Sequence, residues 1–393
     1  MPARGWSASG GKIAIILGTR PEIIKMSPII RACKKCGLGY FILHTGQHYD
    51  YELDKKIFED LELEEPKYNL NVGKNEYRKQ IGIMVKQIGK ILLKEKADLA
   101  LVQGDTNSVL AGSLAAKKVK IKLGHHEAGL RSHDLSMLEE TNRIISDHVS
   151  DYLFAPTADA FKNLNEEGIN EKRILLTGNT VVDAVYENLE LAKKKVNILE
   201  DLKLQSGNYI VVTAHRAENV DKPERLKGIL EGLRLIGQDF KIPIIYSMHP
   251  RTANNINKFG LAVPPQITVV KPLGYLEFLQ LEANSKLIIT DSGGLQEEAS
   301  ILKIPCVTVR DNTERPESIE AGANILAGTE SEKIRAAAKK VIARGKNWPE
   351  LYGDGHAAER IVEFIRREKS KRWKNWPIYL SLRSKVGSFL RKI

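Results

Sequence analysis

Residues 286–301 read KLIITDSGGLQEEASI, and this stretch contains the pattern that decides the fold. The aliphatic and β-branched run Leu287–Thr290 leads into a polar, glycine-containing turn, and the turn leads into a segment of good helix formers. A buried strand that enters a helix through a tight turn is typical of parallel α/β sheets, whose faces are covered by helices. The stretch therefore predicts one strand–turn–helix unit of such a sheet.

The same pattern recurs along the chain in two series. The first predicted strands are Ile13–Leu17, Tyr40–His44, Leu99–Val102, Ile121–His125, Tyr152–Ala155 and Ile174–Leu176. The second are Tyr209–Thr213, Ile244–Met248, Ile267–Val270, Leu287–Thr290 and Cys306–Val309. Two such series predict an α/β protein with two doubly wound, Rossmann-like domains facing across a cleft, where the ligands of such sheets bind.

The boundary between the predicted domains falls in a mostly helical, Lys-rich stretch, Asp183–Ser206, which becomes poor in apolar residues toward its end. We place the N-terminal domain at residues 12–182 and the C-terminal domain at 183–354. A helix at about Gly355–Arg367 is compatible with packing back on the N-terminal domain or on the second. Residues 368–393 form a basic tail with interspersed aromatic residues.

The composition is that of a globular protein, with 42% hydrophobic and 28% charged residues among 393. The sequence shows neither a membrane span nor a secretory signal, and three cysteines are too few for a disulfide framework, so we expect a soluble, cytoplasmic protein. The net charge of +11 comes mostly from residues 366–393, which hold ten Lys or Arg and one acidic residue. The rest is nearly balanced, so we expect no nucleic-acid partner.

The turn after Leu287–Thr290 is the most specific candidate for a binding site. Gly293 and Gly294 let backbone N–H groups approach a diphosphate, and Ser292 adds a hydroxyl. Glu298, about one turn into the helix, is able to hold ribose hydroxyls. The alternative is an ordinary strand-to-helix turn, which explains the residue types less well.

Two cations mark a second predicted helix start. The strand that ends at Leu17 is followed by GTRPE, so that Arg20 precedes a proline suited to the first helical turn, and Lys25 lies about one turn further on. Both side chains are candidates to receive a phosphate at the helix N-terminus. A surface arginine and a lysine that packs its aliphatic stem explain them equally well.

Carboxylates follow further strands of the first series. Asp105 has an ordinary explanation as the N-cap of a helix over Thr106–Lys117. Glu127 is harder to dismiss, because it follows two histidines in an apolar strand, where an unpaired charge is costly. Glu139 begins another helix, where acidic residues complement the helix dipole, and an i,i+4 ion pair with Arg143 is the ordinary explanation for that pair.

Two charged positions follow strands of the second series. His215 comes just after a predicted strand and is a candidate acid, base or phosphate ligand, although a single histidine more often satisfies local hydrogen bonds. The loop Arg310–Glu317, which contains Arg315, is too densely charged for solvation to be its only role.

Common cofactor motifs are absent from the sequence. There is no G-x-G-x-x-G fingerprint and no P-loop, so NAD-dependent hydride transfer and ATP hydrolysis lose support. Cys33 and Cys36 have metal-like spacing, but no second Cys/His pair completes a site. We expect neither a metal nor a redox cofactor.

Eight motifs, in order along residues 12–366, resemble the non-hydrolysing UDP-N-acetylglucosamine 2-epimerase family. They are GTRPE-x-x-K, QGDT, HHEAGLR, EE-x-NR, LTGNTVVDA, DSGGLQEEA, RDNTERPE and YGDG. The resemblance implies a fold like that of the GT-B glycosyltransferases, a dimer, and reversible conversion of UDP-N-acetylglucosamine (UDP-GlcNAc) to UDP-N-acetylmannosamine (UDP-ManNAc). Such an enzyme supplies ManNAc-type sugars for cell-surface polysaccharide or glycan synthesis.

The resemblance also implies roles for individual residues. The UDP site of the family corresponds to Ser292, Gly293, Gly294 and Glu298, with Arg20, His215 and Arg315 near the diphosphate and Phe278 near the uracil. Its other essential polar positions correspond to Lys25, Asp105, Glu127 and Glu139. We take Asp105, Glu127, Glu139 and His215 as candidate catalytic residues, and Arg143 with the remaining positions as candidate substrate-binding residues.

The sequence departs from the family at three places. Leu273-Gly274 stands where many bacterial members carry a glutamine before the Tyr-Leu-x-Phe segment, and the loop between Arg131 and Glu139 is slightly shorter. In Gln47-His48-Tyr49, tyrosine replaces the arginine of a QHR stretch linked to activation by the substrate itself. The resemblance therefore does not carry allosteric activation by UDP-GlcNAc to this chain.

Three rival functions stay open at this point: a GT-B glycosyltransferase with the same UDP site, an epimerase of a related sugar such as a UDP-linked diacetamido uronic acid, and a non-catalytic UDP-sugar sensor. Three carboxylates in addition to a diphosphate site favour elimination and re-addition of UDP over transfer to an acceptor. For the tail, peripheral contact with an anionic membrane and a mobile basic extension are both open interpretations.

Overall fold

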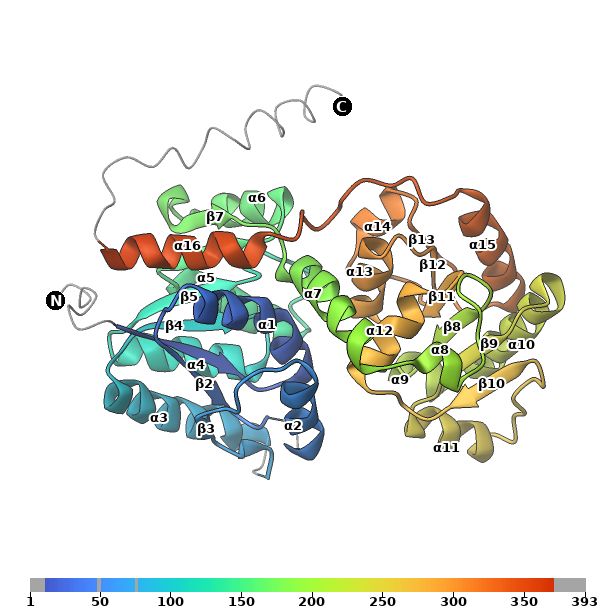
Figure 1. Ribbon diagram of the computed structural model, residues 1–393, viewed down its shortest axis with the longest axis horizontal. Helices are drawn as coiled ribbons and strands as arrows, with labels where there is room; N and C mark the ends of the chain where they lie inside the picture. Colours follow the sequence, from blue (N-terminus) through green and yellow to red (C-terminus); the bar gives the residue numbers. More distant parts are fainter. Residues whose placement is uncertain (1–10, 48–50, 75–76, 371–393) are drawn as a thin grey trace, which may run out of the picture. The chain divides into compact units, whose positions relative to one another are not determined.

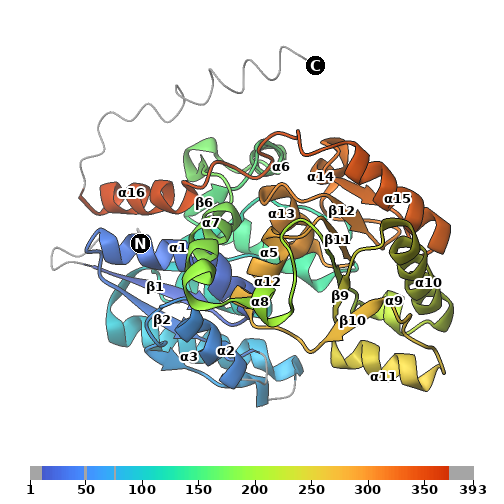
Figure 2. The ribbon, with the colours of Figure 1, turned by 45° about the vertical axis from the view of Figure 1, so that its right-hand side comes forward.

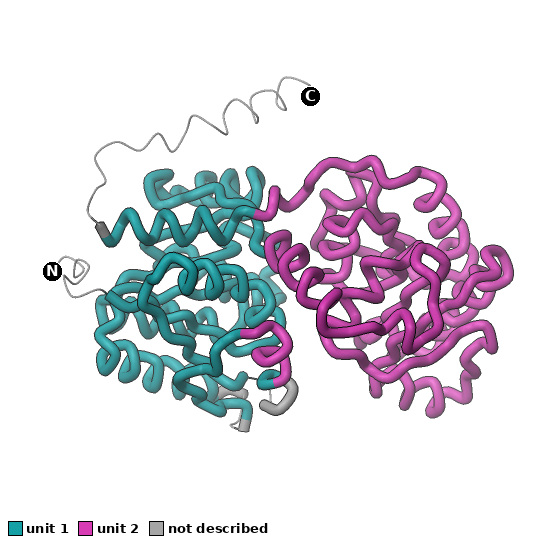
Figure 3. Tube along the Cα trace, viewed as in Figure 1, with its two compact units in different colours: residues 1–55, 63–180, 356–393 teal, residues 56–62, 181–355 magenta. Residues whose placement is uncertain are grey.

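The computed structural model describes residues 11–47, 51–74 and 77–370 of the chain. The chain divides into two compact units, which Figure 3 distinguishes by colour. Unit 1 comprises residues 1–55, 63–180 and 356–393, and unit 2 comprises 56–62 and 181–355. The division at 180/181 lies two residues before the expected one, and 56–62, expected in the N-terminal domain, clusters with unit 2. His48, Tyr49 and the tail from residue 371 lie outside the described residues.

Unit 1 is built on one parallel sheet (Figure 1), whose strand order is β3-β2-β1-β4-β5-β6-β7. Its strands are β1 (Lys12–Leu17), β2 (Tyr40–His44), β3 (Tyr68–Asn69), β4 (Ala97–Gln103), β5 (Lys122–His126), β6 (Tyr152–Ala155) and β7 (Ile174–Leu176). The six strands expected in this half are confirmed, and the two-residue β3 was missed. The order reverses between β1 and β4, which is the kind of position where doubly wound sheets bind ligands.

Helices follow the strands of unit 1 in the expected alternation. They are α1 (Arg20–Lys35), α2 (Tyr51–Asp60), α3 (Tyr77–Glu95), α4 (Asn107–Lys118), α5 (Leu138–Val149), α6 (Ala158–Glu166) and α16 (Ala357–Ser370), with 3-10 turns at Val72–Lys74 and Glu171–Arg173. The second half of α2, from residue 56, clusters with unit 2. Buried aliphatic residues such as Ile16, Val102 and Ile88 form the core between the sheet and these helices. The apolar strands are thus covered as an α/β sheet requires.

Helix α16 is the last described element of the chain, and it packs on unit 1 beside α1 in both ribbon views (Figures 1 and 2). Ile361, Val362 and Ile365 form its buried stripe. The ring of Phe364 meets that of Tyr152 edge-on at a centroid distance of 5.1 Å, and Arg360 donates to the Thr177 carbonyl at 2.9 Å. Of the two open placements for this helix, the structure has the one on unit 1.

Unit 2 contains a second parallel sheet, with the order β10-β9-β8-β11-β12-β13. Its strands are β8 (Ile210–Thr213), β9 (Ile244–Ser247), β10 (Ile267–Val270), β11 (Leu287–Thr290), β12 (Cys306–Thr308) and β13 (Asn324–Leu326). All five expected strands are present, and β13 was missed. Its helices are α7 (Thr180–Lys195), α8 (Ile198–Asp201), α9 (Ala217–Val220), α10 (Pro223–Phe240), α11 (Pro250–Lys258), α12 (Tyr275–Ala283), α13 (Gly293–Ile301), α14 (Pro316–Glu320) and α15 (Ser331–Ala343).

The helical stretch expected between the domains consists of α7 and α8. Val181, Val182 and Val185 of α7 pack with Leu279 and Ile301 in one apolar cluster, so most of α7 is part of unit 2. No helix within the described ranges is long and apolar enough to cross a membrane.

Candidate active site

Glu127 follows β5 and is the central acidic side chain at the carboxyl edge of the unit 1 sheet. Its carboxylate is 5% exposed and accepts from Lys25 Nζ at 2.7 Å and from Asn179 Nδ2 at 3.0 Å through Oε1, while Gln103 Nε2 donates to Oε2. Its backbone has φ +64°, a left-handed conformation that costs a non-glycine residue about 1–2 kcal/mol. Such strain persists where surrounding contacts enforce it, and it clusters at functional sites.

His126, the residue before Glu127, contacts the backbone of Lys25 indirectly, through Thr180. Its Nε2 lies 2.7 Å from Thr180 Oγ1, whose hydroxyl donates to the Lys25 carbonyl at 2.7 Å. Because the Thr180 hydroxyl proton is donated to the Lys25 carbonyl, the Thr180 oxygen can only accept from His126, so Nε2 of His126 must carry the proton. Burial lowers the pKa of His126 to about 4, so the ring is neutral at physiological pH and adds no charge beside Lys25.

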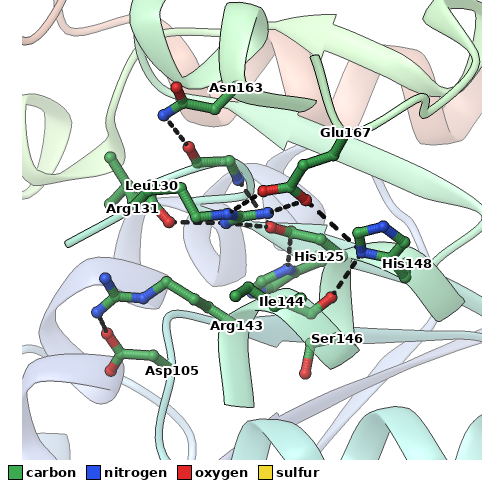
Figure 4. Close-up of polar contacts among 12 residues, drawn as sticks. Asp105, His125, Leu130, Arg131, Arg143, Ile144, Ser146, His148, Asn163 and Glu167 are labelled. Atoms are coloured by element: carbon green, nitrogen blue, oxygen red, sulfur yellow. Dashed lines mark hydrogen bonds and ion pairs between the residues drawn. The ribbon is translucent and has the colours of Figure 1, made fainter. Parts of the chain in front are cut away.

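Asp105 lies in the turn between β4 and α4, but it does not cap α4 as expected. The adjacent Thr106 is the N-cap and accepts from the Val109 N–H through its hydroxyl. The chain turns at Gly104, which has φ +83°, so the hydroxyl of Thr106, and not the carboxylate of Asp105, reaches the first N–H groups of the helix. The Asp105 carboxylate pairs instead with Arg143 of α5, as Figure 4 shows.

The expected i,i+4 pair between Glu139 and Arg143 is likewise replaced by another contact. Arg143 pairs with Glu140 at 2.8 Å, and Glu139 is exposed. Glu140 is buried and accepts from the backbone N–H groups of Ser132 and His133 at 2.9 and 3.0 Å. Adjacent helical residues point about 100° apart, so only one of the two glutamates can face the loop. Glu140 thus anchors the loop before α5, and Glu139 is left available to a ligand.

Glu22 in the GTRPE motif is a structural carboxyl that the sequence did not single out. It is buried and accepts from the Gly18 N–H at 2.9 Å, the Thr19 hydroxyl at 2.8 Å and the Thr106 hydroxyl at 2.9 Å. Burial raises its pKa to about 7, although these hydrogen bonds act in the other direction. Glu22 thereby joins the turn after β1 to the turn after β4, and Arg20 is exposed at the start of α1.

In unit 2, the turn after β11 presents the expected helix N-terminus. Helix α13 begins at Gly293 with Ser292 as the N-cap residue, and the Ser292 hydroxyl makes no capping bond within the described residues. The first N–H groups of a helix have no partner inside the helix and attract anions. A Cβ added to Gly293 would lie 2.4 Å from Glu314 Oε1, so the Glu314 carboxylate would have to move, whereas Gly294 is exposed.

Asp291 holds the adjacent turn in place. Its fully buried carboxylate accepts from the His215 and Arg216 N–H groups at 2.9 Å and from Asn219 Nδ2 at 3.1 Å. The half-exposed ring of His215 has Nδ1 3.3 Å from Asp291 Oδ1. One carboxylate thus joins the turn after β8 to the start of the DSGG turn, and it positions His215 beside that turn.

The charged loop after β12 leads to Arg315. The Arg315 guanidinium donates to the buried Glu297 at 2.7 Å, and its backbone N–H donates to the Thr313 hydroxyl, which donates in turn to Gln296 at 2.6 Å. The loop is therefore tied to α13. Glu298 on the same helix is half-buried, and Phe278 packs against the apolar cluster that includes Leu281 and Ala299.

The structure brings together two groups of the expected residues: Lys25 with Glu127, and Asp105 with Arg143. It also places His215 beside the turn that begins α13. Sequence reasoning missed the supporting residues Gln103, Asn179 and Asp291. Among the described residues, no group of three or more His, Cys, Asp or Glu side chains could hold a metal ion.

Two parallel α/β units with polar side chains after the strand ends match the architecture of GT-B-like proteins. A family model described as UDP-N-acetylglucosamine 2-epimerase matches residues 31–366, and the chain belongs to this family, whose members are isomerases. The chain is 51% identical over 360 residues to the UDP-N-acetylglucosamine 2-epimerase of Methanocaldococcus jannaschii, covering 90% of this chain and 98% of that protein.

A solved structure and a second relative are also similar to this chain. The crystal structure of the Methanocaldococcus jannaschii UDP-GlcNAc 2-epimerase in complex with UDP-GlcNAc and UDP matches with a TM-score of 0.81 and 52% identity, covering 90% of this chain and 99% of that one. A UDP-2,3-diacetamido-2,3-dideoxy-D-glucuronate 2-epimerase of Pseudomonas aeruginosa is 40% identical over 358 residues, covering 90% of this chain and 99% of that protein.

Proposed function

We propose that this protein interconverts UDP-GlcNAc and UDP-ManNAc by inverting carbon 2 of the sugar. The observation that carries the proposal is the buried Glu127 carboxylate, held by Lys25 and Asn179 in a strained backbone next to the turn of Asp105. Two carboxylates on adjacent strand ends suit proton transfer at a carbon atom. The 51% identical relative that bears the name of this activity supports the choice of substrate.

The chemistry explains why such groups are needed. The hydrogen on carbon 2 is not acidified by an adjacent carbonyl, so its direct removal would be very slow. Anti elimination of UDP across the C1–C2 bond forms 2-acetamidoglucal, with the C2 proton taken by a base and the C1–O bond electrons leaving with UDP. Re-addition of UDP, with a proton delivered to the other face of carbon 2, gives the manno epimer.

In this scheme the carboxylates of unit 1 handle the proton. Asp105, Glu127 and Glu139 remove it, return it and orient the ring, and each general acid–base step contributes about 100- to 10,000-fold. Lys25 pairs with the Glu127 carboxylate at 2.7 Å and orients it. Arg143 orients Asp105 through the corresponding ion pair.

The groups of unit 2 hold the leaving nucleotide. The N–H groups of Gly293 and Gly294 and the Ser292 hydroxyl bind the diphosphate, and His215 and Arg315, together with Arg20 of unit 1, stabilise its charge. Glu298 binds the ribose and Phe278 lies against the uracil. Retention of UDP matters because the same molecule must attack the glycal in the return step.

A second candidate substrate has specific support. The 40% identical relative acts, by its name, on UDP-2,3-diacetamido-2,3-dideoxy-D-glucuronate. Incubating the purified protein separately with that compound and with UDP-GlcNAc, without any acceptor, and separating the epimers by chromatography distinguishes the two. We expect UDP-ManNAc from UDP-GlcNAc. Turnover of the diacetamido compound but not of UDP-GlcNAc contradicts the proposal. So does turnover that requires a sugar acceptor.

We further propose that the protein acts as a cytoplasmic homodimer that supplies ManNAc-type sugars for cell-surface polysaccharide or glycan synthesis. The family resemblance supports the dimer, and the nucleotide-sugar substrate supports the compartment. Light scattering on the purified chain tests the dimer by its mass. Sedimentation with anionic vesicles tests whether the basic tail contacts membranes.

A further inference from the structure

His125, the residue before His126 in β5, is fully buried and contacts two hydrogen-bond acceptors. Its Nδ1 lies 2.7 Å from Oδ1 of Asp147, and its Nε2 lies 2.8 Å from the carbonyl oxygen of Gly104. A carboxylate and a carbonyl both accept, and neutral imidazole has only one N–H group. Only the imidazolium form satisfies both contacts.

The surroundings are charged in the way this form requires. Asp147 accepts from Arg131 at 2.7 Å and from the Gly129 N–H at 3.1 Å through its other oxygen, so it is ionised. Burial alone raises the pKa of Asp147, but His125 and Arg131 together lower it below its ordinary value. Arg131 also pairs with Glu167 at 2.6 Å, as Figure 4 shows.

The charges of this network balance. The titratable and charged groups around His125 come from several elements and are Asp147 and Arg143 of α5, Arg131 and Glu127 after β5, Asp105 after β4, Glu167 after α6, and the neighbouring His126. Two cations, His125 and Arg131, face two anions, Asp147 and Glu167. A buried imidazolium would be costly if it were unpaired, but here it has a carboxylate at hydrogen-bond distance.

The two contacts of His125 reach the two segments that carry the proposed catalytic carboxylates. Gly104 directly precedes Asp105 and has φ +83°. Gly129, which donates to Asp147, lies two residues after Glu127 and has φ +84°, and a Cβ there would lie 2.2 Å from the Ala160 carbonyl. The His125–Asp147 pair therefore connects the turn of Asp105 to the loop of Glu127, with Asp147 held on α5.

We propose that His125 is a positioning residue whose two ring nitrogens both donate, an imidazolium that fixes the Asp105 turn relative to the Glu127 loop. It touches neither carboxylate and acts through the Gly104 carbonyl and Asp147. Its importance for turnover rests on the proposed function, whereas its protonation state does not. Misplacing a reacting group by about 1 Å can cost on the order of 100-fold in rate, which sets the scale of the expected effect.

The protonation state is tested without turnover. In the full-length protein labelled with ¹⁵N-histidine, we expect an imidazolium signal with both ring nitrogens protonated at pH 8.5, where exposed histidines are neutral. The signal should disappear in His125→Gln. If all nine histidines give neutral signals at pH 8.5, the proposal is overturned, and this spectrum of the unsubstituted protein decides even if the variant fails to fold.

The positioning role is tested by kinetics. His125→Gln should lower kcat by about 10- to 100-fold while the KM for the UDP-sugar and the Kd for UDP change less than about twofold, because the unit 2 groups are intact. His356→Gln, at an exposed ring outside this network, is the control and should keep its kcat. A kcat for His125→Gln equal to that of the control overturns the role. An inactive unsubstituted protein that retains the imidazolium signal contradicts the proposed function instead.

Discussion

The Nζ atom of Lys25 lies 2.7 Å from Oε1 of Glu127, although 102 residues separate the two along the chain. Lys25 comes from the second turn of α1 and Glu127 from the end of β5, two elements that the sheet order brings to the same edge. A buried carboxylate is stable when a cation and further donors satisfy it, and here Asn179 and Gln103 provide the other hydrogen bonds. The proposed proton transfer depends on this pair, because Lys25 holds the Glu127 carboxylate in place.

Replacing Glu127 by glutamine should remove proton transfer and leave nucleotide binding intact. We expect kcat to fall by about 100- to 10,000-fold, because the amide cannot act as an acid or base, while the Kd for UDP measured by calorimetry stays within twofold. Glu190→Gln, at an exposed ion pair on α7, is the control and should behave as the unsubstituted protein does. Retained turnover in Glu127→Gln would remove Glu127 from the mechanism.

Substitution of the two adjacent glutamates of α5 should have different effects, because Glu139 is proposed to take part in the reaction and Glu140 to hold the loop before α5. Glu140→Gln loses charged hydrogen bonds to the Ser132 and His133 N–H groups and should cost about 1–3 kcal/mol of unfolding free energy. Glu139→Gln should leave stability unchanged, since the side chain is exposed. It should lower kcat, because Glu139 is one of the carboxylates proposed to handle the C2 proton. Urea unfolding and steady-state rates of both variants check this, and equal stability losses would contradict the assignment.

The two glycines at the start of α13 should respond differently to alanine. In Gly293→Ala the new methyl group displaces the Glu314 carboxylate and weakens its ion pairs with Arg310 and Arg216, so stability should fall by about 0.5–1 kcal/mol. Gly294→Ala has no neighbour closer than 3.9 Å and should gain up to about 1 kcal/mol from helix propensity. Both should weaken UDP binding, because each methyl group lies at the proposed diphosphate site. Thermal unfolding with and without UDP measures both effects, and unchanged UDP binding in both variants would refute the placement of the diphosphate.

Glu22 should make the protein less stable as the pH rises. Burial raises its pKa from 4.5 to about 7, so its contribution is fully present below pH 4.5 and is lost as the pH rises through 7. That shift corresponds to about 3 kcal/mol at full ionisation. The difference in unfolding free energy between the unsubstituted protein and Glu22→Gln, measured from pH 4.5 to 8, should shift by about this amount in favour of the variant. A difference that is independent of pH would show that Glu22 ionises normally.

Much of the fold was predictable, because buried parallel strands read as apolar runs such as Leu287–Thr290. Strand β3 has only two residues, and β13 begins with the polar Asn324, so neither produces that pattern clearly. Helix α16 could not be placed from its sequence, since an amphipathic stripe does not specify which surface it covers.

The candidate site was predictable only in part. Asp105 and Glu127 are visible as charges at strand ends, but Asp105 next to Thr106 offers two possible helix caps, and only the backbone turn selects one. Asp147 lies within a helix and looks like a surface residue in the sequence, yet it is fully buried against His125 and Arg131. Long-range pairs of this kind depend on the sheet order, which local patterns do not contain.

Incubation of the purified protein with UDP-GlcNAc alone in D₂O, followed by proton NMR, tests the central claim most directly. Elimination and re-addition on opposite faces predict that UDP-ManNAc appears with deuterium at carbon 2, and that the remaining UDP-GlcNAc also gains deuterium there. Epimerisation without deuterium at carbon 2, or no UDP-ManNAc at all, would contradict the account.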